Sequence, residues 1–400
     1  MTRPKLWTKD FIMVCVTNLL LAMNYFLLMV IFSEYAVIKF DAPQSLAGLA
    51  SSIFIIGTLC VRPLAGKYLD VIGRKKMLYT GIIIFAITTG LYLVIDHLPL
   101  LMIDRFIHGA AYGVASTAIT TVMTSSIPRE RSGEGIGYFS MSVTIATAIG
   151  PFIALLLVQH TGYSMTFLMT LSFAVVALLA SLALKVENIT LSKEELDSLK
   201  GFRISDFFEF SAAPMALMMV ILGFAYSSVL TFISSYSNEV NLSEAASFFF
   251  IVYAVFLLAS RPFTGKRFDL KGENSVVYPC MALFLIGLVI LSQAQHGLVL
   301  LLAGACIGIG YGTTMSSVQT IMVKKAPPHR AGLANSTFFI SFDLGLGIGP
   351  FVLGAMLPSL GYRGMYISMA VVVLLCIIFY YFTHGRKNKS EQYVEKEQVS

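Results

Sequence analysis

Long apolar segments alternate with short polar ones along the whole chain. A helix needs roughly 20 apolar residues to cross the hydrocarbon of a bilayer. Twelve segments reach about this length, and we predict a membrane-spanning helix in each of them: 11–36, 46–64, 76–95, 98–124, 134–158, 163–184, 212–236, 246–263, 276–294, 298–322, 332–357 and 362–383. The pattern therefore predicts an all-α polytopic membrane protein.

The longest polar stretch lies in the middle of the chain and divides the predicted helices into two sets of six. We expect an N-terminal six-helix bundle at 1–184, a cytoplasmic linker at 185–210 and a C-terminal six-helix bundle at 211–383. Residues 384–400 are polar, and their composition predicts a cytoplasmic tail without a core of its own.

The two halves of the sequence repeat each other at a constant offset of 199 residues. Many recurring residues are glycine, proline or charged, which apolar composition alone would not align; they include the pairs Gly66 and Gly265, Asp70 and Asp269, Gly109 and Gly308, Gly113 and Gly312, Gly150 and Gly349, and Pro151 and Pro350. Secondary transporters are built from such repeats, with a cavity near the midplane between rocking halves. The repeat thus predicts two pseudo-symmetric halves and a transport function.

Composition and charge agree with a chain embedded in lipid. Of the 400 residues, 56% are hydrophobic and 12% charged, whereas a soluble domain carries about 25% charged residues. If both termini are cytoplasmic, the cytoplasmic segments hold 25 of the 28 basic residues, and only Lys39 and Arg363 lie outside. This asymmetry predicts cytoplasmic termini, so the net charge of +6 reflects orientation rather than nucleic-acid binding. We expect a multi-pass protein of a bacterial plasma membrane.

The loop after the second predicted span carries a recognisable pattern. It reads G-x-x-x-D-x-x-G-R-K from Gly66 through Asp70, Gly73 and Arg74 to Lys75. This resembles the loop signature of the major facilitator superfamily. Gly66 would let helix ends approach closely, and Asp70 would face a helix N-terminus or pair with a base. The alternative is an ordinary basic loop, which explains the lysines but not the Gly-Asp-Gly frame.

The fourth predicted span holds the ionisable residues Asp104, Arg105 and His108, followed by Gly109 and Gly113. This is similar to the R-x-x-[QH]-G-x-x-x-G element of the same family. A central Arg costs roughly 2.5 kcal/mol or more to insert, so we expect Arg105 to face a cavity or a partner, with Asp104 nearest in sequence. Snorkelling of Arg105 to the outer interface and a purely local hydrogen bond of His108 are the alternatives.

Glycine-proline pairs mark the fifth and eleventh predicted spans, at Gly150-Pro151 and Gly349-Pro350. The first resembles the element of proton-driven antiporters in this family, but Ala146, Ala154 and Leu155 stand at its flanking glycine positions. Small residues permit close helix contact and proline bends a helix, so these residues are candidates for packing or gating.

Few acids lie inside the predicted spans. Asp343 lies near the middle of the eleventh span and Glu34 near the outer end of the first, which also carries Asn24. An acid within the membrane is a functional candidate by default. We therefore expect Asp343, Glu34, Asn24 or the Asp104 cluster to couple protons or line the cavity. The alternative for Asp343 is a structural hydrogen bond, and for Glu34 a solvated interfacial position is the favoured interpretation.

The resemblance covers roughly residues 8–385. It implies a major facilitator fold of twelve helices in two six-helix halves, similar to the drug:proton antiporter group. The expected function is efflux of small amphipathic compounds by alternating access, driven by the proton gradient. No P-loop, hydrolytic triad or metal-ligand spacing is present, so we expect neither an enzyme nor a cofactor or metal. We expect a monomer that binds a small molecule and protons. Alternatives are a metabolite or metallophore exporter, a nutrient symporter, or a receptor or scaffold that transports nothing.

Overall fold

A computed structural model describes residues 5–128, 132–186, 207–327 and 331–386. Within these ranges the chain is almost entirely helical and contains no strand. It divides into two compact units, Met1–Phe202 and Arg203–Ser400. The linker predicted at 185–210 and the tail predicted at 384–400 fall mostly outside the described residues.

The described part of the first unit contains six helices: α1 Lys9–Phe40, α2 Gln44–Ile72, α3 Arg74–Leu91, α4 Leu98–Ser126, α5 Ser132–Thr161 and α6 Tyr163–Leu182. The boundaries of α1 show why such a helix begins and ends where it does. The hydroxyl of Thr8 accepts a hydrogen bond from the backbone N–H of Phe11, which satisfies one otherwise unpaired donor. At the other end, Asp41 adopts a left-handed conformation with φ 49°.

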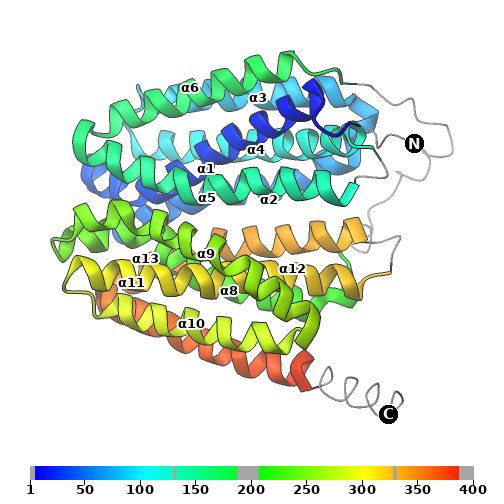
Figure 1. Cartoon of the computed structure of the whole chain (residues 1–400). Helices are drawn as coiled ribbons and strands as arrows, with labels where there is room; N and C mark the ends of the chain where they lie inside the picture. The colour runs from blue at the N-terminus through cyan, green and yellow to red at the C-terminus, as the bar shows by residue number, and fades with distance from the viewer. Residues whose placement is uncertain (1–4, 129–131, 187–206, 328–330, 387–400) are drawn as a thin grey trace, which may run out of the picture. The chain divides into compact units, whose positions relative to one another are not determined.

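Among the described residues, the second unit contains, in chain order, η3 Phe210–Ala212, α8 Ala213–Glu239, α9 Ser243–Lys271, α10 Asn274–Ser292, α11 Gly297–Ile307, η4 Gly308–Gly312, α12 Thr313–Lys325, α13 Ala331–Tyr380 and η6 Tyr381–Gly385 (Figure 1). The segment η4 is a π-helical turn between α11 and α12, whereas α4 runs unbroken through the equivalent residues. The helical chain continues to Gly385, a little beyond the predicted end at 383.

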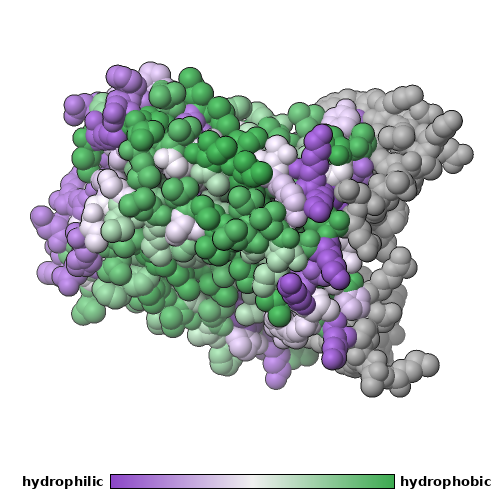
Figure 2. Space-filling view, turned by 90° about the horizontal axis from the view of Figure 1, so that it is seen from above, coloured by the Kyte–Doolittle hydropathy of each residue, from purple (hydrophilic) through white to green (hydrophobic). Residues whose placement is uncertain are grey.

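The membrane-spanning character of the fold is confirmed. Nine helical segments among the described residues are long and apolar enough to cross a bilayer. Hydrophobic side chains cover the middle of the face seen in Figure 2, and hydrophilic ones gather toward its ends. The count of twelve spans stays a prediction. The helix α3 opens with three basic residues, and α13 covers both the eleventh and twelfth predicted spans, with a break at Gly361 where φ is 62°.

The sequence repeat is also a repeat of backbone conformation. Among the described residues, the glycines with positive φ are Gly73 (104°) and Gly162 (82°) in the first unit and Gly272 (78°) and Gly361 (62°) in the second. Each glycine of the first unit is related to one of the second by the offset of the sequence repeat. L side chains rarely adopt such angles, so glycine is needed for the turns after the second and the fifth helix of each unit.

Glycines also set the closest helix contacts. A Cβ added to Gly109 of α4 would overlap the carbonyl oxygen of Phe54 on α2, and one added to Gly308 would overlap the carbonyl oxygen of Tyr253 on α9. Phe54 and Tyr253 are themselves related by the offset of the sequence repeat. The hydroxyl of Thr58 adds a hydrogen bond of 2.8 Å to the carbonyl of Gly109. The same backbone contact therefore joins equivalent helices in both units.

The other predicted packing glycines behave similarly. A Cβ on Gly150 would lie 3.2 Å from the backbone N of Leu27, and one on Gly349 would overlap the hydroxyl of Ser227. Gly113 and Gly312 also approach α2 and α9 closely. Pro151 and Pro350 lie inside α5 and α13. The Gly-Pro segments thus press α5 against α1 and α13 against α8.

Candidate functional site

Arg105 is the largest fully buried side chain among the described residues, with 1% of its surface exposed. Its Nε donates to the carbonyl oxygen of Ala50 at 3.0 Å, and its Nη2 donates to that of Ser51 at 3.1 Å. The guanidinium carbon lies 4.2 Å from the ring centroid of Phe32 and 4.8 Å from that of Phe54. Backbone dipoles and aromatic faces therefore compensate its charge. Arg105 joins α4 to α1 and α2, and it does not snorkel.

His108 lies one turn further along α4 and is completely buried. Its Nδ1 is 2.6 Å from the hydroxyl of Tyr92, and its Nε2 is 3.1 Å from the hydroxyl of Thr89. The Thr89 hydroxyl already donates to the carbonyl of Phe85 at 2.7 Å. Because a hydroxyl carries one hydrogen, Nε2 donates to Thr89, and in a neutral ring Nδ1 then accepts from the Tyr92 hydroxyl. This arrangement satisfies a neutral imidazole at both nitrogens, as the local hydrogen-bond interpretation expected.

Asp104 differs from both neighbours. It is 4% exposed, and its Oδ2 has no hydrogen-bond partner among the described residues. Its expected partner Arg105 gives its hydrogen bonds to α2 instead. The three ionisable residues of α4 are therefore neighbours that do not form one hydrogen-bonded cluster. A buried carboxylate oxygen without a donor is costly, so Asp104 is the member of this group with unused hydrogen-bonding capacity.

The polar residues of α1 are buried rather than solvated. Glu34 is 7% exposed, so the predicted solvated interfacial position is wrong. It lies close enough to Tyr163 of α6 to interact with it electrostatically. The Nδ2 of Asn24 donates to the carbonyl of Thr170 at 3.0 Å. Glu34 and Asn24 of α1 therefore both face α6 within the first unit.

Asp343 lies on α13 and is 7% exposed. Two residues further along, a Cβ on Gly345 would overlap the carbonyl oxygen of Val220 on α8. This acid therefore sits where α13 and α8 approach each other closely. The carboxyl candidates Asp104 and Asp343 belong to different units.

Each unit also holds a cluster of aromatic rings that sequence reasoning missed. Tyr112 stacks on Tyr25 with ring centroids 5.4 Å apart, and Tyr311 stacks on Tyr226 at 4.0 Å. Further rings complete each cluster at positions related by the sequence repeat: Phe54 and Phe85 in the first unit, Tyr253 and Phe284 in the second. In the sequence, aromatic residues recur at these positions at the offset of the repeat, and this recurrence could have revealed the two clusters. The stacking partners Tyr25 and Tyr226 do not share the offset of the repeat, so the offset alone does not find them.

The loop between α2 and α3 contains an ion pair. The Nε of Arg74 lies 2.5 Å from Oδ1 of Asp70, and its Nη2 lies 3.4 Å from Oδ2. The positive φ of Gly73 reverses the chain between these two residues. Asp70 therefore pairs with a base, which is one of its two predicted partners. Within the first unit, a Cβ added to Gly66 would meet only the Thr117 methyl at 4.0 Å, so no close approach of helix ends occurs there, and that role of Gly66 stays a prediction.

The second unit does not copy this ion pair. The side chain of Asp269 lies outside the described part of the structure, and no atom of the described residues of this unit lies within 4 Å of a Cβ added to Gly265. The position of Arg74 is taken by Glu273, whose Oε2 lies 2.5 Å from Nε2 of His384. The two halves thus share the turn but differ in the charges that surround it.

Comparison with known proteins identifies the family. The model of the Major Facilitator Superfamily matches residues 14–350. The multi-drug resistance efflux pump PmrA of Streptococcus pneumoniae is 24% identical over 340 residues, covering 83% of this chain and 84% of that protein. The multidrug resistance protein MdtG of Salmonella paratyphi B is 25% identical over 346 residues, covering 83% and 84%.

Solved structures share the same fold. The nucleoside transporter NupG aligns with a TM-score of 0.72 at 14% identity, covering 94% of this chain and 100% of that one. A bacterial homolog of the human lysosomal transporter Spinster aligns with a TM-score of 0.77 at 13% identity, covering 93% and 96%. Since the family model spans most of the sequence, this chain belongs to the Major Facilitator Superfamily of transporters.

Proposed function

We propose that this transporter exports small amphipathic compounds in exchange for protons, by alternating access. Two relatives with matching lengths, PmrA and MdtG, are named as multidrug efflux or resistance proteins. Each unit holds a buried cluster of stacked aromatic rings, which would contact apolar or aromatic substrates in a conformation that exposes the faces of the rings. The proton gradient supplies the driving force.

One observation carries proton coupling: Asp104 is a buried carboxyl with an oxygen that lacks a partner among the described residues. A coupling group must change its charge or its partner as the transporter switches sides. Arg105 is held by backbone carbonyls and His108 is satisfied as a neutral ring. Asp104 is under neither constraint, and Asp343 is the second candidate. Substrate-induced proton release from proteoliposomes tests the proposal, and substrate transport without proton movement would contradict it.

Export of one dedicated metabolite or metallophore, or symport of a nutrient, is the second candidate. The nucleoside and peptide transporters among the solved structures share the fold at 16% identity or less. Likeness at that level extends to architecture and not to substrate. A binding screen of amphipathic cations, nucleosides and peptides on the purified protein distinguishes these candidates. A receptor or scaffold role without transport predicts no movement of any of these compounds.

We further propose that both termini and the linker at 185–210 are cytoplasmic, because the basic residues gather on that side. On a cysteine-free background, a cysteine at Ser198 should resist an impermeant thiol reagent in intact cells and react after permeabilisation. A cysteine at Asn241, which lies between α8 and α9 on the side that we propose to be external, is the matched control and should react in intact cells. Labelling at Ser198 before permeabilisation contradicts this orientation.

Asp70 is proposed to latch the cytoplasmic gate through Arg74. Asp70→Asn keeps the shape of the side chain but removes its charge. The hydrogen bonds between residue 70 and Arg74 then no longer join opposite charges and become weaker. We expect transport to fall about tenfold, corresponding to ~1.4 kcal/mol, with normal amounts of folded protein in the membrane. Asp10→Asn is the control, because Asp10 also accepts a hydrogen bond near a helix end. Equal transport by wild type and Asp70→Asn would remove Asp70 from the mechanism.

A further inference from the structure

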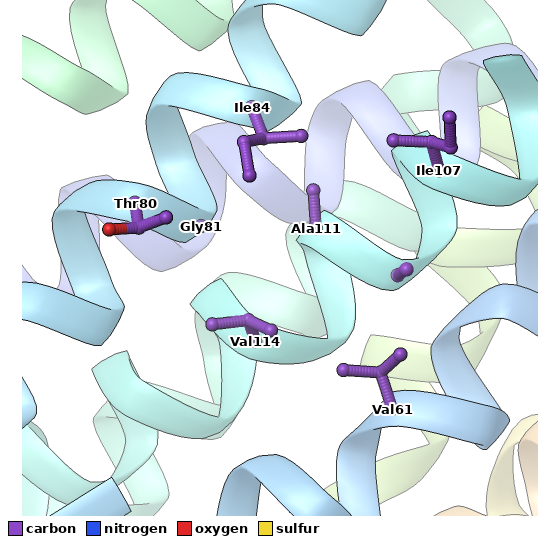
Figure 3. A pocket seen from close by; sticks show the side chains of 8 residues that line it. Val61, Thr80, Gly81, Ile84, Ile107, Ala111 and Val114 are labelled. Carbon is purple, nitrogen blue, oxygen red and sulfur yellow. The ribbon is translucent and has the colours of Figure 1, made fainter. Parts of the chain in front are cut away.

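The first unit has an apolar groove on its outer surface. The helix α4 packs against both α2 and α3, which barely touch each other. Between them lies a cavity of about 150 Å³, lined by Val61 of α2, by Thr80, Gly81 and Ile84 of α3, and by Ile107, Ala110, Ala111 and Val114 of α4 (Figure 3). The small residues of α4 form its floor. Its rim is open, because Ile84 and Ile107 are both exposed.

The lining of this groove is apolar and lies within predicted membrane spans, so we place it against hydrocarbon and not water. A cavity of about 150 Å³ lined by apolar groups holds a group the size of benzene, and an empty one loses dispersion contacts along its lining. Exposed residues continue from the groove along one side of α3, at Thr80, Ile83, Ile84 and Ile87. They are spaced by three or four residues and so form one stripe. An acyl chain can therefore lie along this stripe and place several methylenes in the groove.

The positive charge of Lys76 at one end of the stripe favours a lipid with an anionic headgroup. Lys76 is exposed and precedes Thr80 by four residues, so it lies on the same face, roughly 6 Å along the axis. It forms no salt bridge with any of the described residues. Its neighbour Arg74 is already paired with Asp70. An ammonium group at the membrane surface above an apolar groove complements a phosphate followed by an acyl chain.

We propose that the groove between α2, α3 and α4 binds one anionic phospholipid, with its phosphate on Lys76 and an acyl chain over Ala110 and Ala111. The neighbouring Lys75 provides an internal control. It carries the same charge at the next position of α3 but lies about 100° around the helix, with its Nζ 5.7 Å from the ring centroid of Tyr79. A specific site therefore depends on Lys76 and not on Lys75, whereas general attraction to the surface depends on both.

Photo-crosslinking of the full chain in nanodiscs tests this proposal. The probe is phosphatidylglycerol with a photoreactive acyl chain, and phosphatidylcholine with the same chain is the comparison. We expect crosslinks to α3 and α4 near the groove. Lys76→Gln should lower them about fivefold, the effect of one lysine near an anionic surface, and Lys75→Gln should leave them unchanged. Ala110→Leu should also lower them by filling the groove, whereas Ala180→Leu on α6 should not.

Several outcomes overturn the proposal. Equal crosslinking of the two lipids, or equal losses in Lys76→Gln and Lys75→Gln, would mean that no headgroup site exists at Lys76. Crosslinking unaffected by both Lys76→Gln and Ala110→Leu would mean that lipid around this unit is non-specific. Because Lys76 is an exposed side chain, its variant is expected to fold, so the test does not depend on Ala110→Leu.

Discussion

Asp104→Asn is expected to abolish proton-driven accumulation while leaving substrate binding intact. The amide has nearly the shape of the carboxyl, but it cannot take up and release a proton. A gradient of one pH unit is worth about 1.4 kcal/mol per proton, or about tenfold in accumulation. The variant should therefore lose about tenfold accumulation under such a gradient. The measurement is substrate uptake and substrate-induced proton release in proteoliposomes with an imposed pH gradient.

Two further variants show whether the loss of coupling is specific to Asp104. Asp96→Asn is the matched control, because Asp96 is an acid with a 78% exposed side chain that pairs with Lys39 at 3.1 Å, and it should couple normally. Asp343→Asn tests the candidate of the second unit. Loss of coupling in Asp343→Asn alone would transfer the role to α13. If both Asp104→Asn and Asp343→Asn couple as wild type does, the hypothesis fails, and Glu34 or uniport becomes the better account.

Gly109→Ala is expected to have the largest effect on stability. The added methyl group would overlap the carbonyl oxygen of Phe54, which belongs to the backbone of α2 and cannot rotate away. The two helices must separate, which also weakens the hydrogen bond from Thr58 to the Gly109 carbonyl. Overpacking of this kind costs about 1–3 kcal/mol. The variant should show a lower unfolding temperature in detergent and less folded protein in the membrane.

Glycine variants elsewhere separate this contact from a general effect of alanine. Gly66→Ala should be close to neutral, since its methyl group would meet only Thr117 at 4.0 Å. Gly308→Ala should act in the same direction as Gly109→Ala, because it meets the Tyr253 carbonyl at the equivalent position. If Gly109→Ala unfolds at the wild-type temperature, α2 and α4 do not depend on this backbone contact.

Much of the architecture could be predicted from the sequence. Lipid cannot hydrogen-bond the backbone, so a long apolar segment in this solvent has to be a helix. That reasoning located the helices, although Gly361 and the basic start of α3 show why the exact count of spans is harder to fix. The internal sequence repeat likewise found glycines that share a positive φ, because that conformation depends on the absence of a Cβ.

The tertiary structure decided the partners of the polar residues. Sequence spacing suggested Asp104 as the partner of Arg105, but Arg105 binds two carbonyls of α2 and leaves an oxygen of Asp104 without a partner among the described residues. Glu34 and Asn24 turn toward α6, and Tyr25 stacks on Tyr112 of α4. Helix formation in lipid depends on the residues of one segment, so composition and periodicity reveal it. Contacts between helices depend on the rotation and axial offset of each helix, which side chains from all neighbouring helices determine together.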